Sequence, residues 1–265
     1  EEMSDYTSQE KIYAGYVQTS NQFGNLQVLL GVRYEQTRLE NTGNLVSFDE
    51  EGDYASTTDV TNEEDYSHFF PMAHLRFTAS NSTNLRLALT RSIARPNHYD
   101  LVPYNFVARE DRELERGNPD LEPTLAVNAD LMVEHFLPSL GLVSGGLFYK
   151  SISNPIFWRM DEEEGGAFDG YESFKPMNGG EASLMGVELN WQQQLTFLPG
   201  FLNGFGIYTN YTYTWSETEL AGYADKIRLP GQAKHMANFA ISYEKYGFSG
   251  RVALNFHGDY ISEVG

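Results

Sequence analysis

The residues best suited to metal chemistry are two histidines in one strand-like stretch. His68 and His74, with Arg76 beside them, are separated by even numbers of residues, so all three point to one face of a β-strand. Imidazole is a common metal ligand. Six residues along a strand nevertheless place the two rings about 20 Å apart, too far to share an ion. We therefore predict no metal site and expect these side chains to form hydrogen bonds instead.

Hydrolytic catalysis has little support in the sequence. Ser92, His98 and Asp100 supply a nucleophile, a base and an acid within one stretch, but nothing fixes their mutual geometry. The Gly-x-Ser-x-Gly nucleophile elbow is absent. The chain also has no cysteine, which excludes a thiol nucleophile, a thiolate metal site and disulfides. We predict no catalytic residue, no cofactor and no enzymatic activity.

Two runs of carboxylates have the composition of cation-binding loops. Residues 49–53 read Asp-Glu-Glu-Gly-Asp, and residues 161–164 read Asp-Glu-Glu-Glu. Carboxylate oxygens suit Ca²⁺, but neither run has the twelve-position spacing of a calcium loop. We interpret both runs as solvated loop charge. Divalent-ion bridging to lipopolysaccharide stays as the alternative.

Two further stretches combine aromatic rings, amides and cations in a pattern that suits a ligand. Such rings stack on sugars and on catechols alike, so the residue types leave the ligand class open. Packing of a loop is the alternative role for the same side chains. The predicted substrate contacts are Arg95, Asn97, Tyr99, Tyr104, Asn105, Trp158, Arg159 and Tyr171.

Composition narrows the class of protein. The 265 residues carry a formal net charge of −19, and a polyanionic surface repels nucleic acid. Aromatic residues make up 14% of the chain, with 17 Tyr and 17 Phe, which is typical of rings placed where apolar and wet layers meet. No stretch approaches the ~20 apolar residues of a transmembrane helix.

Alternation with a period of two residues recurs along the whole chain and predicts about ten β-strands. The clearest example begins at Leu26 and places apolar and polar side chains on opposite faces. The apolar set predicted to face outward is Leu26, Val28, Leu30, Val32, Val252, Leu254 and Phe256. The polar set predicted to face the interior, towards a lumen or a plug, is Arg33, Glu35, His68, His74, Arg76, Arg251 and Asn255.

The links between these strands alternate in length without exception. Short links with turn residues fall at 20–25, 79–84, 136–141, 197–204 and 245–250. Long links fall at roughly 38–66, 95–126, 153–181 and 216–236. The long links hold 26 of the 37 carboxylates, and aromatic residues gather towards strand ends. An antiparallel up-and-down transmembrane β-barrel explains this segregation, with tight turns on one rim and long loops on the other.

Several stretches in family order resemble TonB-dependent outer-membrane receptors. They are YAGY at 13–16, GVRYEQT at 31–37, SIARP at 92–96, GNPDLEP at 117–123, GVEL at 186–189, FLPG at 197–200, NYTY at 210–213 and LPGQAKH at 229–235. The resemblance covers nearly the whole chain. It implies a 22-stranded barrel that encloses a plug and lies in the outer membrane of a Gram-negative bacterium.

The resemblance also implies a function and partners. Members import scarce large nutrients, such as ferric siderophores, haem, cobalamin or glycans, with energy from the TonB complex. We expect residues 1–265 to be part of a single barrel domain, with the plug domain and the final strands absent from this sequence. The expected partners are outer-membrane lipid and lipopolysaccharide, the plug of the same full-length protein, and the TonB complex.

Two other functions stay open. A passive outer-membrane porin or a barrel adhesin would share the strand pattern but would need no plug. A soluble secreted β-sandwich that binds a ligand would share the alternation, but its two ends face the same water and give no reason for segregated loops.

Overall fold

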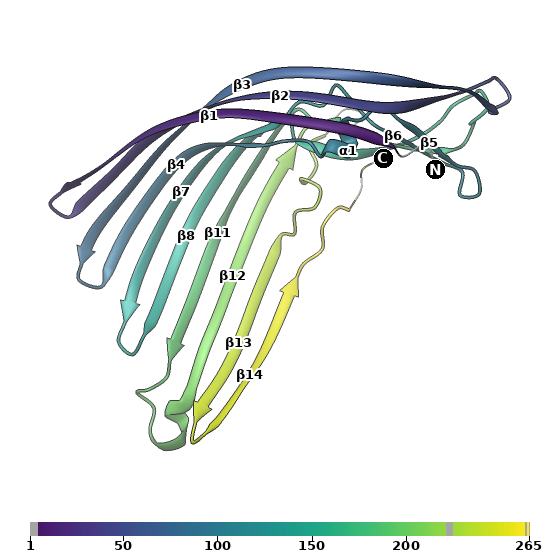
Figure 1. The fold of residues 1–265 in the computed structure, drawn as a ribbon. Coiled ribbons are helices and arrows are strands. Elements are labelled where there is room, and N and C mark those ends of the chain that lie inside the picture. Colours follow the sequence, from purple (N-terminus) through teal and green to yellow (C-terminus); the bar gives the residue numbers. More distant parts are fainter. Residues whose placement is uncertain (1–4, 221–224, 263, 265) are drawn as a thin grey trace.

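The computed structural model describes residues 5–220, 225–262 and 264. Ten long strands form one curved antiparallel sheet (Figure 1). In spatial order they are β1 (Tyr6–Phe23), β2 (Leu26–Phe48), β3 (Tyr54–Ser80), β4 (Thr83–Ala94), β7 (Thr124–Leu137), β8 (Gly141–Ser153), β11 (Glu181–Gln194), β12 (Phe205–Thr218), β13 (His235–Lys245) and β14 (Phe248–His257). The predicted fold class, all-β with about ten antiparallel up-and-down strands, is confirmed.

A second, smaller sheet lies in the links that follow β4 and β8, and it was not predicted. Its four strands pair in the order β5 (Asn105–Ala108), β6 (Glu113–Arg116), β10 (Glu172–Asn178) and β9 (Ile156–Glu162). In the described part of the chain the helices are α1 (His98–Leu101) and the 3-10 helix η2 (Gly200–Gly204). Within the described residues no helix is long and apolar enough to cross a membrane.

The register of the large sheet places apolar side chains in continuous rows on one face. One such row crosses six neighbouring strands and consists of Val28, Leu75, Leu87, Leu131, Leu147 and Val187. These side chains point away from the hollow of the curved sheet, and three of them are exposed, including Leu131 at 46% and Leu147 at 55%. An apolar belt of this extent is unfavourable in water and suits contact with lipid. We call this the convex face.

The opposite, concave face carries polar side chains and supports the loops. Its residues alternate with those of the convex face, so that Arg33 and Glu35 lie beside Val32 and Tyr34 on β2 but point the other way. α1, β5 and β6 lie on the hollow side of β1–β3 (Figure 1).

Four of the predicted short links form tight turns close to the predicted positions, whereas the link predicted at 197–204 spans residues 195–204 and contains the 3-10 helix η2. β1 and β2 are joined at residues 24–25, and β13 and β14 at residues 246–247. Gly24 and Gly247 have φ values of 58° and 75°, which glycine adopts without steric cost. These turns fix each register and thereby decide which side chains meet across neighbouring strands.

The predicted long link at 38–66 is wrong for most of its length. β2 continues to Phe48 and β3 begins at Tyr54, so the two strands form a hairpin that extends far beyond the apolar belt. Only residues 49–53 form a turn, in which the Asp49 carboxylate accepts the backbone N–H groups of Glu51 and Asp53 at 3.1 and 2.7 Å. Charged pairs such as Arg38 with Asp65, 3.0 Å apart, line the solvated strands, and their charge led to the loop prediction. Of the link at 216–236, residues 221–224 lie outside the described residues.

The large sheet is open in the described part of the chain. β1 and β14 form its two edges and are not paired with each other. An open sheet with exposed edges is the expected outcome for a part of a larger barrel, because only closure satisfies edge N–H and C=O groups in lipid.

The two faces predict opposite responses to a new charge. Leu131→Arg on the convex face should cost about 2–4 kcal/mol of barrel stability, because the guanidinium must enter the lipid layer. Thr212→Arg is the matched control, since Thr212 is on the concave face opposite Glu188. Urea unfolding in phospholipid vesicles measures both variants of the full-length protein. Equal losses would contradict the assignment of the faces.

Candidate functional site

The loop sheet, defined as β5, β6, β9 and β10, is anchored at two places on the large sheet, at β2 and at the segments that follow β12 and β14. One apolar cluster joins it to β2 and contains Leu39, Leu101, Leu121 and Ile156. A second cluster joins it to the segments that follow β12 and β14 and contains Phe157, Met177, Leu220, Ile227, Ile261 and Val264. The backbone N–H of Met160 also donates to the Val264 carbonyl at 3.0 Å. The loop sheet therefore forms a packed body over one end of the concave face.

The segment 117–123, GNPDLEP, is the structural centre of these loops. Leu121 is fully buried. Asn118 Nδ2 donates to the Pro176 carbonyl at 2.9 Å, and its backbone N–H donates to the Asp100 carbonyl at 2.7 Å. A Cβ on Gly117 would overlap the Val102 carbonyl oxygen, so only glycine fits there. This segment is one of the stretches that carry the family resemblance, but the sequence did not predict its packing role.

Amide side chains then join the two long links. Asn178 Nδ2 donates to the Glu122 carbonyl at 2.9 Å, while the Glu122 N–H donates to Asn178 Oδ1 at 2.8 Å. Asn154 Nδ2 donates to the Glu122 carboxylate at 2.6 Å. This reciprocal pairing satisfies backbone groups that no strand partner reaches.

Arg95, a predicted ligand contact, is held against the barrel wall by ion pairs and by hydrogen bonds from one of its terminal nitrogens. Its guanidinium lies 2.7 Å from Glu35, 3.4 Å from Glu10 and 3.1 Å from Thr37. The side chain is only 23% exposed. Arg95 therefore fixes the start of the long link against β1 and β2. The contact joins a residue predicted to bind a ligand, Arg95, to one predicted to face the interior, Glu35.

Tyr99, Tyr104 and Asn105 pack within the loops in the same way. The Tyr104 side chain is buried, and its hydroxyl donates to Glu115 at 2.6 Å. Burial raises the pKa of Tyr104, and the adjacent Glu115 raises it further, so the phenol stays protonated. The rings of Tyr99 and Tyr104 are 4.6 Å apart, and Asn105 donates to the Val46 carbonyl at 3.1 Å. These residues hold α1 and β5 in place.

The remaining candidates are more accessible. Asn97 is exposed and precedes α1 without a capping hydrogen bond from its side chain. Trp158 is half-buried on β9, opposite Pro176. Arg159 pairs with Asp161 at 2.8 Å, and the Tyr171 ring lies beneath the guanidinium of Arg112. The role of these residues in ligand binding stays a prediction.

The sequence reasoning missed an aromatic row on the loop sheet. Phe106 on β5, Phe174 on β10 and Trp158 on β9 lie on one face by register, with Glu115 of β6 between Phe106 and Phe174. Phe106 is 43% exposed. Nothing in the local pattern of residues 105–108 marks a strand, so only the fold reveals that Phe106 and Trp158, 52 positions apart, share a surface. These rings offer apolar contact area to a ligand on either side of Glu115.

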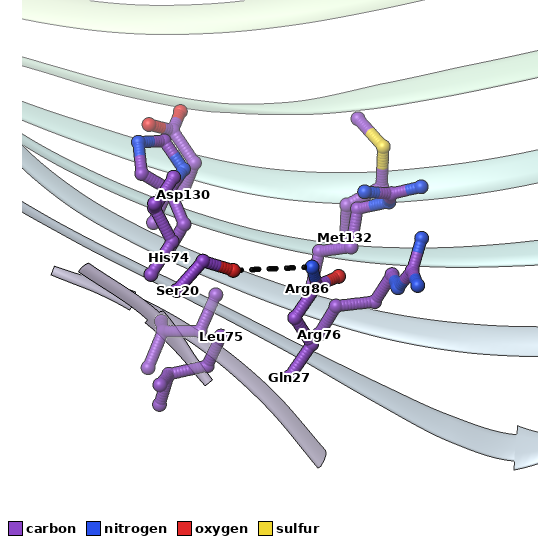
Figure 2. A pocket seen from close by; sticks show the side chains of 11 residues that line it. Ser20, Gln27, His74, Leu75, Arg76, Arg86, Asp130 and Met132 are labelled. Atoms are coloured by element: carbon purple, nitrogen blue, oxygen red, sulfur yellow. Dashed lines mark hydrogen bonds between the residues drawn. The ribbon is translucent and has the colours of Figure 1, made fainter. Parts of the chain in front are cut away.

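The residues predicted to face the interior all lie on the concave face. Arg33 pairs with Glu35 at 2.5 Å, and the His68 ring lies between those of Tyr66 and Phe70. His74 and Arg76 line a cavity of about 380 Å³ near the short turns (Figure 2). The others lie on β14, where Arg251 is opposite Ser242 and Asn255 is opposite Asn238. In the described ranges no three His, Asp or Glu side chains gather as a metal site.

The acidic run 161–164 is partly paired instead of freely solvated. Arg116 donates to Glu163 at 2.6 Å, which ties β6 to the end of β9. Burial alone would raise the pKa of Glu163, but the hydrogen bonds from Arg116 and Ser173 and the charge of Arg116 outweigh it, and the pKa is lowered.

Truncation of Leu121 tests whether the segment 117–123 organises the loops. Leu121→Ala should destabilise the loop sheet by about 2–5 kcal/mol, because it leaves a cavity between Leu39 and Leu101. Phe106→Ala is the control, since that ring is exposed. Hydrogen exchange should accelerate in residues 98–123 of the Leu121 variant alone. Unchanged protection there would show that other contacts hold the loops.

The Glu163–Arg116 pair predicts a pH response of the same loops. A lowered pKa means that the pair contributes fully above the ordinary glutamate value of 4.5 and is lost as the pH falls through the folded value. The contribution is about 1 kcal/mol or less, because both groups are partly solvated. Proteolysis of the loops should therefore increase below pH 4.5 in the wild type, and Glu163→Gln should show that level at neutral pH. An identical pH profile in the variant would contradict the assignment.

Comparison with solved structures shows that the fold recurs in known transporters and receptors. The "Copper transporter OprC" matches with a TM-score of 0.69 and 14% identity, over 94% of this chain and 36% of that chain. The Serratia marcescens hemophore receptor HasR, in complex with its hemophore HasA and heme, matches with a TM-score of 0.66 and 12% identity, over 94% and 44%. The ferric citrate transporter FecA matches with a TM-score of 0.66 and 17% identity, over 95% and 33%.

The chain thus spans less than half the length of these structures, and identities of this size speak for the fold alone. Comparison with curated proteins gives no match. A family model described as "TonB dependent receptor-like, beta-barrel" matches residues 2–264, which is nearly the whole chain. The chain belongs to the TonB-dependent receptor β-barrel family, whose members are outer-membrane proteins of Gram-negative bacteria.

Proposed function

We propose that the full-length protein imports a scarce large nutrient across the outer membrane and that the TonB system supplies the energy. This chain forms part of the barrel wall and of the external loops. The observation that carries the proposal is the loop sheet, a packed body with an aromatic row, placed over one end of a polar concave face. A passive diffusion pore has no need for a rigid aromatic surface above its lumen.

The concave face is proposed to surround a plug domain of the same protein. A wide interior lined by long polar side chains suits a barrel that encloses a folded domain, because a small barrel is filled by its own side chains. The residues proposed to face the plug or the lumen are Arg33, Glu35, His68, His74, Arg76, Arg251 and Asn255. The convex face is proposed to contact membrane lipid and lipopolysaccharide.

The proposed substrate class is a ferric siderophore, haem, cobalamin or a glycan. Solved structures of similar fold include the copper transporter, the hemophore receptor and the ferric citrate transporter named above. Planar or ring-containing ligands fit the aromatic row best, because stacking gains from flat apolar contact. Asn97, Trp158, Arg159 and Tyr171 are the accessible candidates for this contact, whereas Arg95, Tyr99, Tyr104 and Asn105 support them. No catalytic role is proposed.

Growth assays test the proposal directly. The full-length protein is expressed in a Gram-negative host that lacks its own receptors, and single nutrients from the four classes are supplied as the only source of iron, cobalamin or carbon. Growth on one class should depend on the host's TonB system. Growth that persists without TonB would contradict energised import and favour a passive porin.

Trp158→Ala then tests the aromatic row. Loss of one stacking ring should raise the half-saturating concentration of the imported nutrient about tenfold and leave the maximal rate unchanged. Leu140→Ala is the control, since Leu140 is an exposed residue in the short turn between β7 and β8, far from the loop sheet. Equal uptake by both variants would remove Trp158 from the site.

A further inference from the structure

Arg76 on the concave face is a charge without a partner. It is directly opposite Arg86 in the β3–β4 register. Arginine keeps its charge inside proteins, and like charges placed opposite each other destabilise a strand pair. Glu134 neutralises only Arg86, at 2.8 Å. In the described ranges no carboxylate lies within ion-pair distance of Arg76, and its Nε is buried without an acceptor.

The surroundings of Arg76 form a cavity that opens on the concave face. Its volume is about 380 Å³, and it lies near the short-turn end of β2, β3 and β4. Figure 2 shows Arg76 and Arg86 at one end of this cavity and His74 and Asp130 at the other. Apolar groups, among them Leu29 and Met132, complete the lining. A mixed lining of this kind suits a protein surface better than a small ion.

Charge balance distinguishes a free anion from a carboxylate that belongs to a folded segment. Asp130 lines the same cavity as Arg76 and Arg86, and Glu134 pairs with Arg86 beside it, so the region as a whole has no net positive charge to attract a free anion, although Arg76 itself is unpaired within the described residues. A carboxylate that is part of a folded segment needs no such attraction, because the rest of the segment holds it at high effective concentration. Once placed beside Arg76, it gains two parallel charge-assisted hydrogen bonds and satisfies the buried Nε.

We propose that an Asp or Glu side chain of the domain enclosed by the barrel docks on Arg76, in the cavity that Arg86 shares. The inference rests on the proposed function, since it requires an enclosed domain. It adds the position and the chemistry of a latch, in which the carboxylate holds the enclosed domain against β3 and β4 at the short-turn end. Loss of the latch loosens that domain without altering the loop sheet.

The first test measures leakage through the full-length protein in cells without TonB. Entry of vancomycin, which is too large for ordinary porins, reports on a displaced plug. Arg76→Gln and Arg76→Glu should raise entry roughly tenfold or more, and Arg76→Lys should raise it less, because lysine keeps the charge but lacks the planar fork. Lys150→Gln is the matched control, a concave-face cation opposite Asn128 and Leu184 with no arginine facing it.

A photo-crosslinking amino acid at position 76 provides a second test that does not depend on the stability of the variants. Crosslinked peptides should come from the enclosed domain and contain an Asp or Glu, and exchange of that carboxylate for Gln should reproduce the leak. A tight wild type with tight Arg76 variants, or crosslinks to segments without a carboxylate, would overturn the latch and leave the import proposal intact. A wild type that already leaks would instead overturn the proposed import function.

Discussion

The hydrogen-bond register of the ten-stranded sheet is the constraint on which the other features depend. Each strand is bonded to its neighbours, and successive side chains point to opposite faces, so one register decides the chemistry of both surfaces. The row from Val28 through Leu131 to Val187 keeps one depth of the convex face apolar across six strands. A slip of β2 by one residue would turn its polar side chains Arg33 and Glu35 towards lipid, at a cost of several kcal/mol.

The same register explains where the loops can fold. β2 and β3 extend well past the apolar belt. On the concave side of this extension, Leu39 of β2 is an apolar contact point above the polar lumen. Leu101 and Leu121 pack on Leu39, and Ile156 of β9 packs against the same cluster, which positions the loop sheet. Its far side reaches Val264, which follows the edge strand β14, so β2 and the end of the described chain are linked through the loop sheet. Curvature of the barrel wall and position of the loops are thereby coupled.

Sequence reasoning succeeded where the physics is local. Alternation and turn residues are properties of neighbouring positions, so the strands, the short turns and the fold class could be predicted. It failed where long-range pairing decides. Strand β6 has four residues, and it pairs with β10 through contacts such as Glu113 with Glu172 that no local pattern encodes. The hairpin extension failed for another reason: charged residues such as Arg38 and Asp65 are typical of loops, yet here they pair across solvated strands.

The same distinction between local pattern and long-range contact applies to the candidate ligand residues. Residue type predicted Arg95 and Tyr104 as ligand contacts. Their partners Glu35 and Glu115 lie on other elements, and these contacts already use one terminal nitrogen of Arg95 and the Tyr104 hydroxyl. A polar atom already bonded inside the fold gains little from a ligand, because binding must first break the existing bond. A ligand that covers exposed apolar surface breaks no existing hydrogen bond. The exposed ring of Phe106 and the half-buried ring of Trp158 offer apolar contact area of this kind, which is the physical reason for proposing them as ligand contacts.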